Sequence, residues 1–319
     1  MPEEYSLNTL DSKIIDIVIP AFNARNIIHQ SVSSTLMQTL PEPWQKNVII
    51  VDDGSSDGTG QCCEALFKEQ VKVIYHEQNR GISAGRNTGW RAGSGTYVIF
   101  LDADCEWFST GSLAAHLQIL ESGADVCTGA IVSREKNFWG IYQNAVQSSR
   151  EKAFSSGNQA AFTCANLAIR RSILETSGGF DEGYSHYGFE DRDLLLRLMS
   201  FGTKIYFSSE AAIIHQPYSS LENVCRKFVE SGQHSSVRFQ TAHPEYYARS
   251  LYGKLDCRIH GFPLTVFAKI SEPLIPGLLV LGDKIINSFG VPFPVKKACV
   301  KIMSGLSYMV GTYIGMTSS

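Results

Sequence analysis

Short apolar runs alternate with helix-like segments over the first hundred residues. The apolar runs cover residues 14–19, 47–51, 71–75 and 96–101. Between them, apolar residues recur with helical spacing over 25–39, 59–69 and 82–92. Continuous apolar strands separated by helices are typical of a parallel sheet that is covered on both faces. The pattern therefore predicts an α/β fold with a central, mostly parallel sheet and helices on both faces.

The second half of the chain has a weaker pattern. We expect strands at residues 163–169, 203–207 and 211–214, and helices at 190–202 and 220–240. The character of the chain changes near His243-Pro244, and we place a domain boundary there. The prediction is a first domain over residues 1–245 and a mainly helical, apolar and basic extension over 246–319.

Three polar clusters each follow a predicted strand: Pro20 to Asn23, Asp52 to Asp57, and Asp102-Ala103-Asp104. Ligands of such sheets bind outside the carboxyl ends of the strands, so we expect the clusters to meet at one edge. Asp102 and Asp104, one residue apart, can share Mg²⁺ or Mn²⁺, which also take phosphate oxygens of a substrate. Because acidic residues are also common in turns, a plain turn is the alternative.

The acidic turn from Asp52 to Thr59 has two uses that can coexist. Ser56 or Asp57 is expected to cap the helix that follows. A carboxylate in the same turn can accept hydrogen bonds from a base or a ribose. The glycines of the turn let the backbone come close to a ligand.

These motifs together resemble family 2 glycosyltransferases, which have a Rossmann-like GT-A fold. The matching text is IVIPAFNA (17–24), VIIVDDGSSDGT (48–59), NRGISAGRNTGWRAGSGTYVIFLDAD (79–104), ANLAIRRSILETSGGFDEGY (165–184) and GFEDRDLLLRL (188–198). The resemblance covers about residues 14–215. It implies an inverting enzyme that moves a sugar from a nucleotide-diphosphate sugar, most commonly a UDP-sugar, to a hydroxyl of a glycan or a lipid-linked acceptor.

The resemblance also implies residues that hold the nucleotide. Pro20 would contact it through backbone atoms. Asp53 would bind the base, with Asp52 alongside. Arg86 and Asn87 would lie near the nucleotide and its diphosphate.

Metal and catalytic roles follow from the same resemblance. Asp102 would face the ribose or the metal, and Asp104 would ligate Mn²⁺ or Mg²⁺ at the diphosphate. His215 would lie near the diphosphate or metal, or is an ordinary strand-end histidine. Asp191 would be the general base that takes a proton from the acceptor hydroxyl.

Helical periodicity favours Asp191 over Glu190 as the base. Asp191 shares a helix face with the buried stripe Leu194, Leu195 and Leu198. Glu190 falls on the other face, with Asp193 and Arg197, which we expect to be polar and exposed. The alternative is that both acids only complement the helix dipole.

Charge divides the chain into two parts. The whole chain has 28 basic and 31 acidic residues and a formal charge of −3. Residues 252–319 hold seven basic and three acidic residues, so this segment carries +4 and residues 1–251 carry −7. The balance excludes a generally basic surface, and we expect no nucleic-acid partner.

The basic, apolar tail has two interpretations. It either packs as a helical subdomain, or its apolar faces enter a bilayer while Lys296, Lys297 and Lys301 meet anionic headgroups. No uncharged apolar run reaches about 20 residues, so we expect no orthodox transmembrane helix. The acidic first ten residues do not resemble a signal peptide. We therefore expect a cytoplasmic protein, peripheral at the cytoplasmic face of a membrane in the second interpretation.

Two rival classes share part of this chemistry. A nucleotidyltransferase of GT-A type also uses strand-end acids and a divalent metal. Such enzymes usually open with a glycine-rich basic loop, which Pro20 to Asn23 does not supply. A catalytically silent module that only binds a sugar nucleotide is the other rival; the intact set of Asp53, Asp102, Asp104 and Asp191 argues against it.

Overall fold

The computed structural model describes residues 13–215 and 220–317, which form two compact units. The first unit comprises residues up to 131 together with 163–179 and 198–215. The second comprises 132–162, 180–197 and 216–319. The expected boundary near residue 245 lies inside the second unit and stays a prediction.

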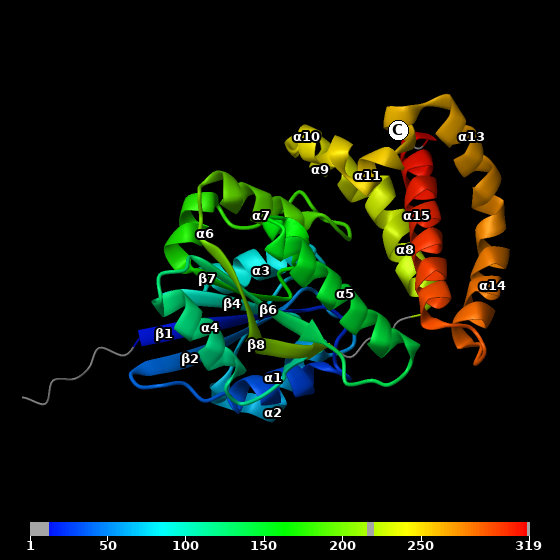
Figure 1. Ribbon diagram of the computed structural model, residues 1–319. Coiled ribbons are helices and arrows are strands. Elements are labelled where there is room, and N and C mark those ends of the chain that lie inside the picture. The colour runs from blue at the N-terminus through cyan, green and yellow to red at the C-terminus, as the bar shows by residue number, and fades with distance from the viewer. Residues whose placement is uncertain (1–12, 216–219, 318–319) are drawn as a thin grey trace, which may run out of the picture. The chain divides into compact units, whose positions relative to one another are not determined.

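The first unit is built on an eight-stranded sheet in the order β3-β2-β1-β4-β7-β6-β8-β5 (Figure 1). Its strands are β1 (Lys13–Ala21), β2 (Trp44–Asp52), β3 (Lys72–Tyr75), β4 (Tyr97–Leu101), β5 (Cys105–Trp107), β6 (Val126–Val132), β7 (Asn166–Arg170) and β8 (Ile205–His215). The four strands from β1 to β4 pair in parallel. β7 is antiparallel to β4 and β6, and β5 is antiparallel to β8. The sheet is therefore mixed, and its parallel half is the part that the apolar runs predict.

Helices cover both faces of the parallel strands, as predicted. They are α1 (Ile28–Leu36), α2 (Thr59–Phe67), α3 (Ile82–Arg91), α4 (Ser112–Glu121) and α6 (Arg171–Ser177). One face of β1, with Ile15, Ile17 and Ile19, joins a core with buried residues of α1, α2 and α4. On the other face α3 lies so close that a Cβ at Gly89 would meet Val18 Cγ1 at 2.2 Å. A glycine is therefore required where α3 crosses β1.

Helices make up most of the second unit. They are α5 (Phe138–Ser155), α7 (Glu190–Ser200, whose last residues belong to the first unit), α8 (Leu221–Glu230), α9 (Ser236–Ala242), α10 (Pro244–Arg249), α11 (Leu251–Lys254), α12 (Cys257–His260), α13 (Phe262–Ser271), α14 (Ile275–Asn287) and α15 (Phe293–Thr317). A π-helical turn at Ser231–Ser235 joins α8 to α9, so the expected helix 220–240 is three segments. A 3₁₀ turn, η4 (Glu272–Leu274), joins α13 to α14.

One expectation for the second half needs correction, and the tail contains one long apolar segment. The strands expected at 203–207 and 211–214 form one continuous strand, β8. The segment Phe262–Asn287, which comprises α13, η4 and α14, is 26 residues long. An 18-residue stretch within it has a mean hydropathy of 1.6, and 11% of that stretch is buried. Among the described residues the segment is one helix that is long and apolar enough to cross a membrane, although Lys269, Glu272, Asp283 and Lys284 interrupt it.

His116 of α4 is a fully buried histidine that is held neutral. Asn166 donates its side-chain amide to the carbonyls of Ala130 and Ala211 at 3.1 and 2.7 Å. Its Oδ1 is therefore an acceptor, and His116 Nε2 donates to it at 2.8 Å. Burial, only partly opposed by this hydrogen bond, lowers the pKa of His116 from 6.5 to about 4.

This buried histidine predicts a loss of stability in mild acid. Below pH 6.5 His116 becomes protonated in the unfolded chain but stays neutral in the native one. The free energy of unfolding therefore falls as pH drops towards 4. From pH 7 to pH 5 the wild type is expected to lose about 2 kcal/mol more than His116→Gln. Urea unfolding of both proteins at the two pH values measures the difference. Equal losses would show that His116 does not titrate differently in the two states.

Candidate active site

The carboxyl ends of the parallel strands meet, as predicted, at one edge of the sheet. The amide of Asp53 donates to the carbonyl of Ala21 at 2.8 Å, and the amide of His76 donates to the carbonyl of Asp52 at 2.9 Å. Pro20 lies in β1 beside Val51, and a Cβ at Gly85 of α3 would meet its Cβ at 3.2 Å. The ends of β1, β2 and β3 are thus joined by backbone hydrogen bonds.

Asp52 holds the turn that leads into α2. Its Oδ1 accepts the amide of Ser55 and its Oδ2 that of Gly60, both at 2.8 Å. Asp57 accepts the amide of Thr59, the first residue of α2, at 3.0 Å, but the N-cap of α2 is Gly58 and not the expected Ser56 or Asp57. Asp52 is 2% exposed, so both carboxylate oxygens have a structural use. Its predicted place alongside the nucleotide stays a prediction.

Asp53 anchors the loop after β3. His76 Nδ1 lies 2.6 Å from Asp53 Oδ1, and the amides of Arg80 and Gly81 donate to the same carboxylate at 2.9 Å. His76 Nε2 in turn lies 2.9 Å from the hydroxyl of Thr88 on α3. Asp53 is 4% exposed. The predicted base-binding carboxylate is therefore fixed in position by its neighbours on two elements.

His76 is a residue of this edge that the sequence analysis missed. It follows β3 directly, just as Asp53 follows β2 and Asp102 follows β4. The rule that placed those two residues at the edge also applies to His76.

Arg86 and Asp102 form an ion pair between α3 and the end of β4. Arg86 is 1% exposed, and its Nη2 donates to Asp102 Oδ1 at 2.9 Å, while the Asp102 side chain is 26% exposed. Asn87, next to Arg86, is equally buried, and its Oδ1 accepts from Trp90 Nε1 at 3.0 Å. The structure thus brings Arg86 to the acidic motif and directs Asn87 to a contact within α3.

Asp104 and His215 lie together at the start of β5. His215, the last residue of β8, pairs with Cys105, and its Nε2 lies 3.1 Å from Asp104 Oδ2. The two side chains are 43% (Asp104) and 27% (His215) exposed, so both can reach a ligand. Within residues 13–215 and 220–317, no group of three His, Cys, Asp or Glu side chains is arranged to hold a metal ion. A carboxylate beside an imidazole nevertheless suits Mn²⁺, with further ligands coming from substrate oxygens.

The start of α7 carries the predicted catalytic acid. Asp191 lies in the first turn and is half-buried, and Leu194, Leu195 and Leu198 are fully buried as expected. The prediction that Glu190 and Asp193 are exposed is wrong: they are 8% and 2% exposed.

Two partners, one in the next turn of α7 and one 50 residues away in sequence, allow Asp193 to be buried. Its Oδ2 accepts from Arg197 Nε at 2.9 Å, and its Oδ1 lies 2.8 Å from His243 Nε2. Buried carboxylates are tolerated when they are paired in this way. Asp193 is therefore a structural residue of the second unit.

Two further features distinguish the entrance to α7. Phe189, just before the helix, has a φ of +73°, and its ring stacks on Phe239 at 4.6 Å. A strained non-glycine residue of this kind persists only where its surroundings hold it.

Burial lowers the pKa of the Arg150 guanidinium, and the negative charge of Asp191 opposes this shift. The charges of Arg150, on α5, and Asp191 therefore interact, and no sequence signal pointed to Arg150.

The fold is that of an α/β protein, and the carboxyl ends of its parallel strands are the candidate ligand site. The model of the family "Glycosyl transferase family 2" matches residues 16–178, just over half of the chain. The chain therefore belongs to glycosyl transferase family 2, which confirms the resemblance in its motifs.

Curated relatives match this chain over part of their length. TuaG of Bacillus subtilis, a putative teichuronic acid biosynthesis glycosyltransferase, is 38% identical over 96 residues, which is 30% of this chain and 37% of TuaG. WfgD of Escherichia coli, a UDP-Glc:α-D-GlcNAc-diphosphoundecaprenol β-1,3-glucosyltransferase, is 32% identical over 100 residues, 31% of this chain and 38% of WfgD. The chain thus spans less than half the length of these two relatives.

A solved structure shares the fold over nearly the whole chain. The mannosyltransferase PcManGT of Pyrobaculum calidifontis, in complex with GDP-Man and Mn²⁺, has a TM-score of 0.59 and 17% identity, and the match covers 92% of this chain and 86% of that one. At this identity the likeness shows the fold, which is the expected GT-A fold with a mainly helical C-terminal region.

Proposed function

We propose that this protein is an inverting hexosyltransferase that uses a nucleotide-diphosphate sugar. A UDP-sugar is the first candidate donor, and a hydroxyl of a glycan or lipid-linked molecule is the acceptor. The observation that carries the proposal is the carboxyl edge of the parallel strands, where Arg86–Asp102 and Asp104–His215 place a buried cation and two partly exposed carboxylates at the same edge as Asp53. Family membership and the donor and acceptor in the name of WfgD support it.

Each residue of the candidate site has a defined role in the proposed reaction. Asp53 and the backbone at Pro20 hold the nucleoside, and Arg86 keeps Asp102 directed towards the ribose. Asp191 removes the proton of the acceptor hydroxyl, whose oxygen attacks the anomeric carbon from the side opposite the leaving nucleoside diphosphate. One displacement inverts the anomeric configuration, so a product with retained configuration would contradict this mechanism.

Asp104 and His215, with Asp102 nearby in sequence, would hold the Mn²⁺ or Mg²⁺ that the family implies. Such an ion supplies positive charge against the diphosphate leaving group. The carboxylate and imidazole at 3.1 Å are a fitting donor pair for Mn²⁺. The PcManGT complex, which contains Mn²⁺ together with GDP-Man, supports this assignment.

The metal assignment is tested by Asp104→Asn. Binding of UDP with Mn²⁺ raises the melting temperature of the wild type, because the ligand binds only the native state. The variant is expected to lose the Mn²⁺-dependent part of this shift. Its Mn²⁺-dependent release of UDP from UDP-glucose is expected to fall on the order of 100-fold.

Glu69→Gln, an exposed acid in the turn after α2, is the matched control and is expected to behave as the wild type. An unchanged Mn²⁺ response in Asp104→Asn would refute the metal assignment. If the wild type binds UDP but turns over no nucleotide sugar, the protein is a silent binding module instead.

The localisation that accompanies this function is the cytoplasmic face of a membrane. The lipid-linked acceptor in the name of WfgD supports it, as does the apolar helical segment of the second unit. Cell fractionation tests this part, since a lipid-linked acceptor requires enzyme at the membrane surface.

A further inference from the structure

We propose that α13 and α14 lie flat in the headgroup region of an anionic bilayer through one apolar face, and do not cross it. The inference rests on the proposed function and deepens it, because it names the surface, the mode of contact and the lipid charge. It concerns the second unit alone.

The face in question runs along the outside of both helices. Its members, called the outer stripe here, are Phe262, Val266, Phe267, Ile270, Leu274, Val280 and Leu281. Phe262 is 82% exposed, and the others range from 39% to 59%. Spacings of three and four residues place most of them on one side of a helix. Large apolar side chains gathered at the surface of two consecutive helices mark a site of interaction.

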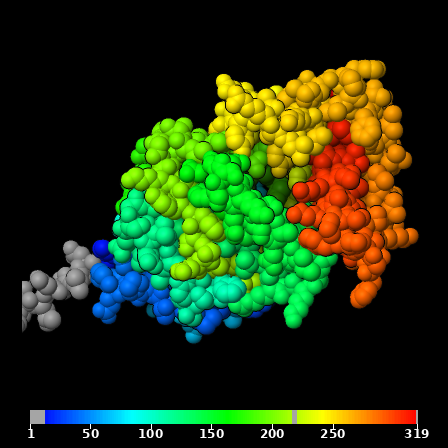
Figure 2. All heavy atoms as spheres, in the orientation of Figure 1, coloured from blue at the N-terminus to red at the C-terminus, as the bar shows by residue number. Residues whose placement is uncertain are grey.

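The opposite face of the same helices is already occupied. Ala268 and Ile286 are buried, and Leu264 and Ile275 pack with Met309 and Val310 of α15. A Cβ on Gly282 would lie 2.5 Å from Leu221 of α8, so the fit there is close. Figure 1 shows α13 and α14 running along α15, and Figure 2 shows their atoms at the surface.

This two-sided arrangement argues against a spanning helix. To cross a bilayer, the segment would have to leave α15 and expose the apolar side chains of Met309 and Val310. The segment is also broken by η4, and Lys269 and Glu272 lie near its middle. A helix that keeps its inner face on protein can offer only its outer face to lipid, which is the in-plane mode of attachment.

The charges beside the outer stripe indicate the lipid. From Phe262 to Asn287 two lysines and two acids balance, and the excess of three lysines, Lys296, Lys297 and Lys301, lies at the start of α15. Lys269, Lys284 and Lys301 are exposed, and lysine side chains can extend their ammonium groups to the headgroups while their stems cover apolar surface. Clusters of this kind are attracted to anionic lipids.

The same charges disfavour a second copy of this chain as the partner. Residues 262–301 have five lysines and two acids, a net charge of +3, so a symmetric dimer through the outer stripe would bring two segments of the same charge together, and like charges across an interface oppose association. An anionic bilayer supplies the complementary charge, so it is the occupant that both the apolar and the basic residues fit.

Vesicle co-sedimentation of the full chain tests the proposal. We expect binding to phosphatidylcholine vesicles with about 30% phosphatidylglycerol, and weaker binding to pure phosphatidylcholine or at high salt. The triple variant Phe262→Ser, Phe267→Ser and Ile270→Ser is expected to lower the partition coefficient at least about tenfold. The control Leu66→Ser with Phe201→Ser removes side chains of similar exposure from the first unit and is expected to bind as the wild type.

The depth to which α13 and α14 insert distinguishes helices that lie in the bilayer plane from helices that cross the bilayer. A Phe267→Trp variant is expected to be quenched most strongly by lipids brominated near the headgroup, and alkaline carbonate is expected to release the bound protein. Quenching only at the bilayer centre, or resistance to carbonate, would overturn the in-plane mode. A dimer without vesicles that the triple variant abolishes would identify a second copy as the occupant.

The same variants separate this inference from the proposed function. The triple variant is expected to release UDP from UDP-glucose at the wild-type rate, because no outer-stripe residue belongs to the proposed site. If the wild type binds vesicles but turns over no nucleotide sugar, the function fails and the membrane surface stands. If the wild type turns over UDP-glucose but binds no vesicles, the proposed function stands and the membrane surface fails.

Discussion

Replacing Asp191 with asparagine is expected to lower kcat on the order of 10³-fold while leaving the fold intact. Asparagine has nearly the same shape but cannot take the proton of the acceptor hydroxyl, and removing a general base costs about this much. Asp191 is half-buried in the first turn of α7, and asparagine removes only the negative charge that acts on the Arg150 guanidinium. Transfer from UDP-glucose to a hydroxyl acceptor measures kcat, and circular dichroism measures the fold.

Two neighbouring acids provide the controls for Asp191. Asp193→Asn weakens the contacts with Arg197 and His243, so we expect a lower melting temperature with kcat reduced far less. Glu190→Gln tests the alternative assignment directly. If Glu190→Gln loses more kcat than Asp191→Asn with equal folding, the base is Glu190. Unchanged UDP binding in Asp191→Asn separates a loss of catalysis from a loss of donor affinity.

Three of the predicted strands are apolar along most of their length. Residues 14–19, 47–51 and 96–101 are continuous apolar runs because both faces of β1, β2 and β4 are covered. β6 and the middle of β8 contain threonine, glycine, serine or glutamate, so their pattern did not identify them. α5 was also missed, because among its 18 residues only Gly140 and Gln147 are buried.

The residues of the candidate site also fall into those that the sequence predicts and those that it does not. Positions that depend on strand ends, such as Asp53 and Asp102, followed from the rule that parallel strands share a carboxyl edge. Partners that depend on tertiary contact did not: the buried Asp193 needs His243, which is 50 residues away in sequence. Sequence periodicity placed Asp193 on the polar face because Glu190 and Arg197 share that face, whereas a paired acid can be buried.

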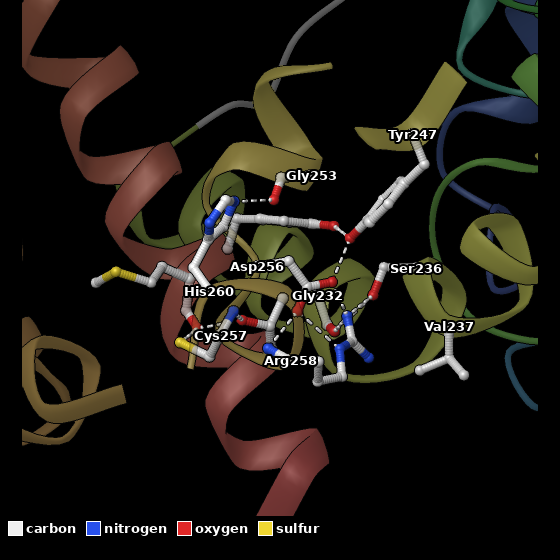
Figure 3. Close-up of polar contacts among 12 residues, drawn as sticks. Gly232, Ser236, Val237, Tyr247, Gly253, Asp256, Cys257, Arg258 and His260 are labelled. Atoms are coloured by element: carbon white, nitrogen blue, oxygen red, sulfur yellow. Dashed lines mark hydrogen bonds and ion pairs between the residues drawn. The ribbon is translucent and has the colours of Figure 1, made fainter. Parts of the chain in front are cut away.

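Replacing Asp256 with alanine is expected to destabilise the second unit by about 3–5 kcal/mol. Asp256 is fully buried, and its two oxygens accept from Arg258 Nε and Nη2 at 2.8 and 2.7 Å (Figure 3). Tyr247 donates its hydroxyl to the same carboxylate at 2.6 Å. Alanine would leave a largely buried guanidinium and a buried hydroxyl without their acceptor. The cost is a large share of the roughly 5–15 kcal/mol that stabilises a typical domain.

Hydrogen exchange is the measurement suited to this network, since the chain has two units and need not unfold in one step. Amides of α10 and α12 are expected to exchange at least about 100-fold faster in Asp256→Ala, which corresponds to roughly 2.7 kcal/mol or more. Glu245→Ala removes an exposed pair with Arg249 in the same segment and is expected to change exchange by less than about fivefold.

A double replacement identifies the cause of the loss. If the cost arises from an uncompensated buried charge, Asp256→Leu combined with Arg258→Met should recover most of the stability, because both charges then leave the interior together. Asp256 Oδ1 also accepts the backbone amide of Arg258 at 2.8 Å and so caps α12. If the loss of stability arises from losing this cap, the double variant should stay as unstable as Asp256→Ala. We expect the first result, since a cap is worth about 1 kcal/mol and a broken buried pair several times more.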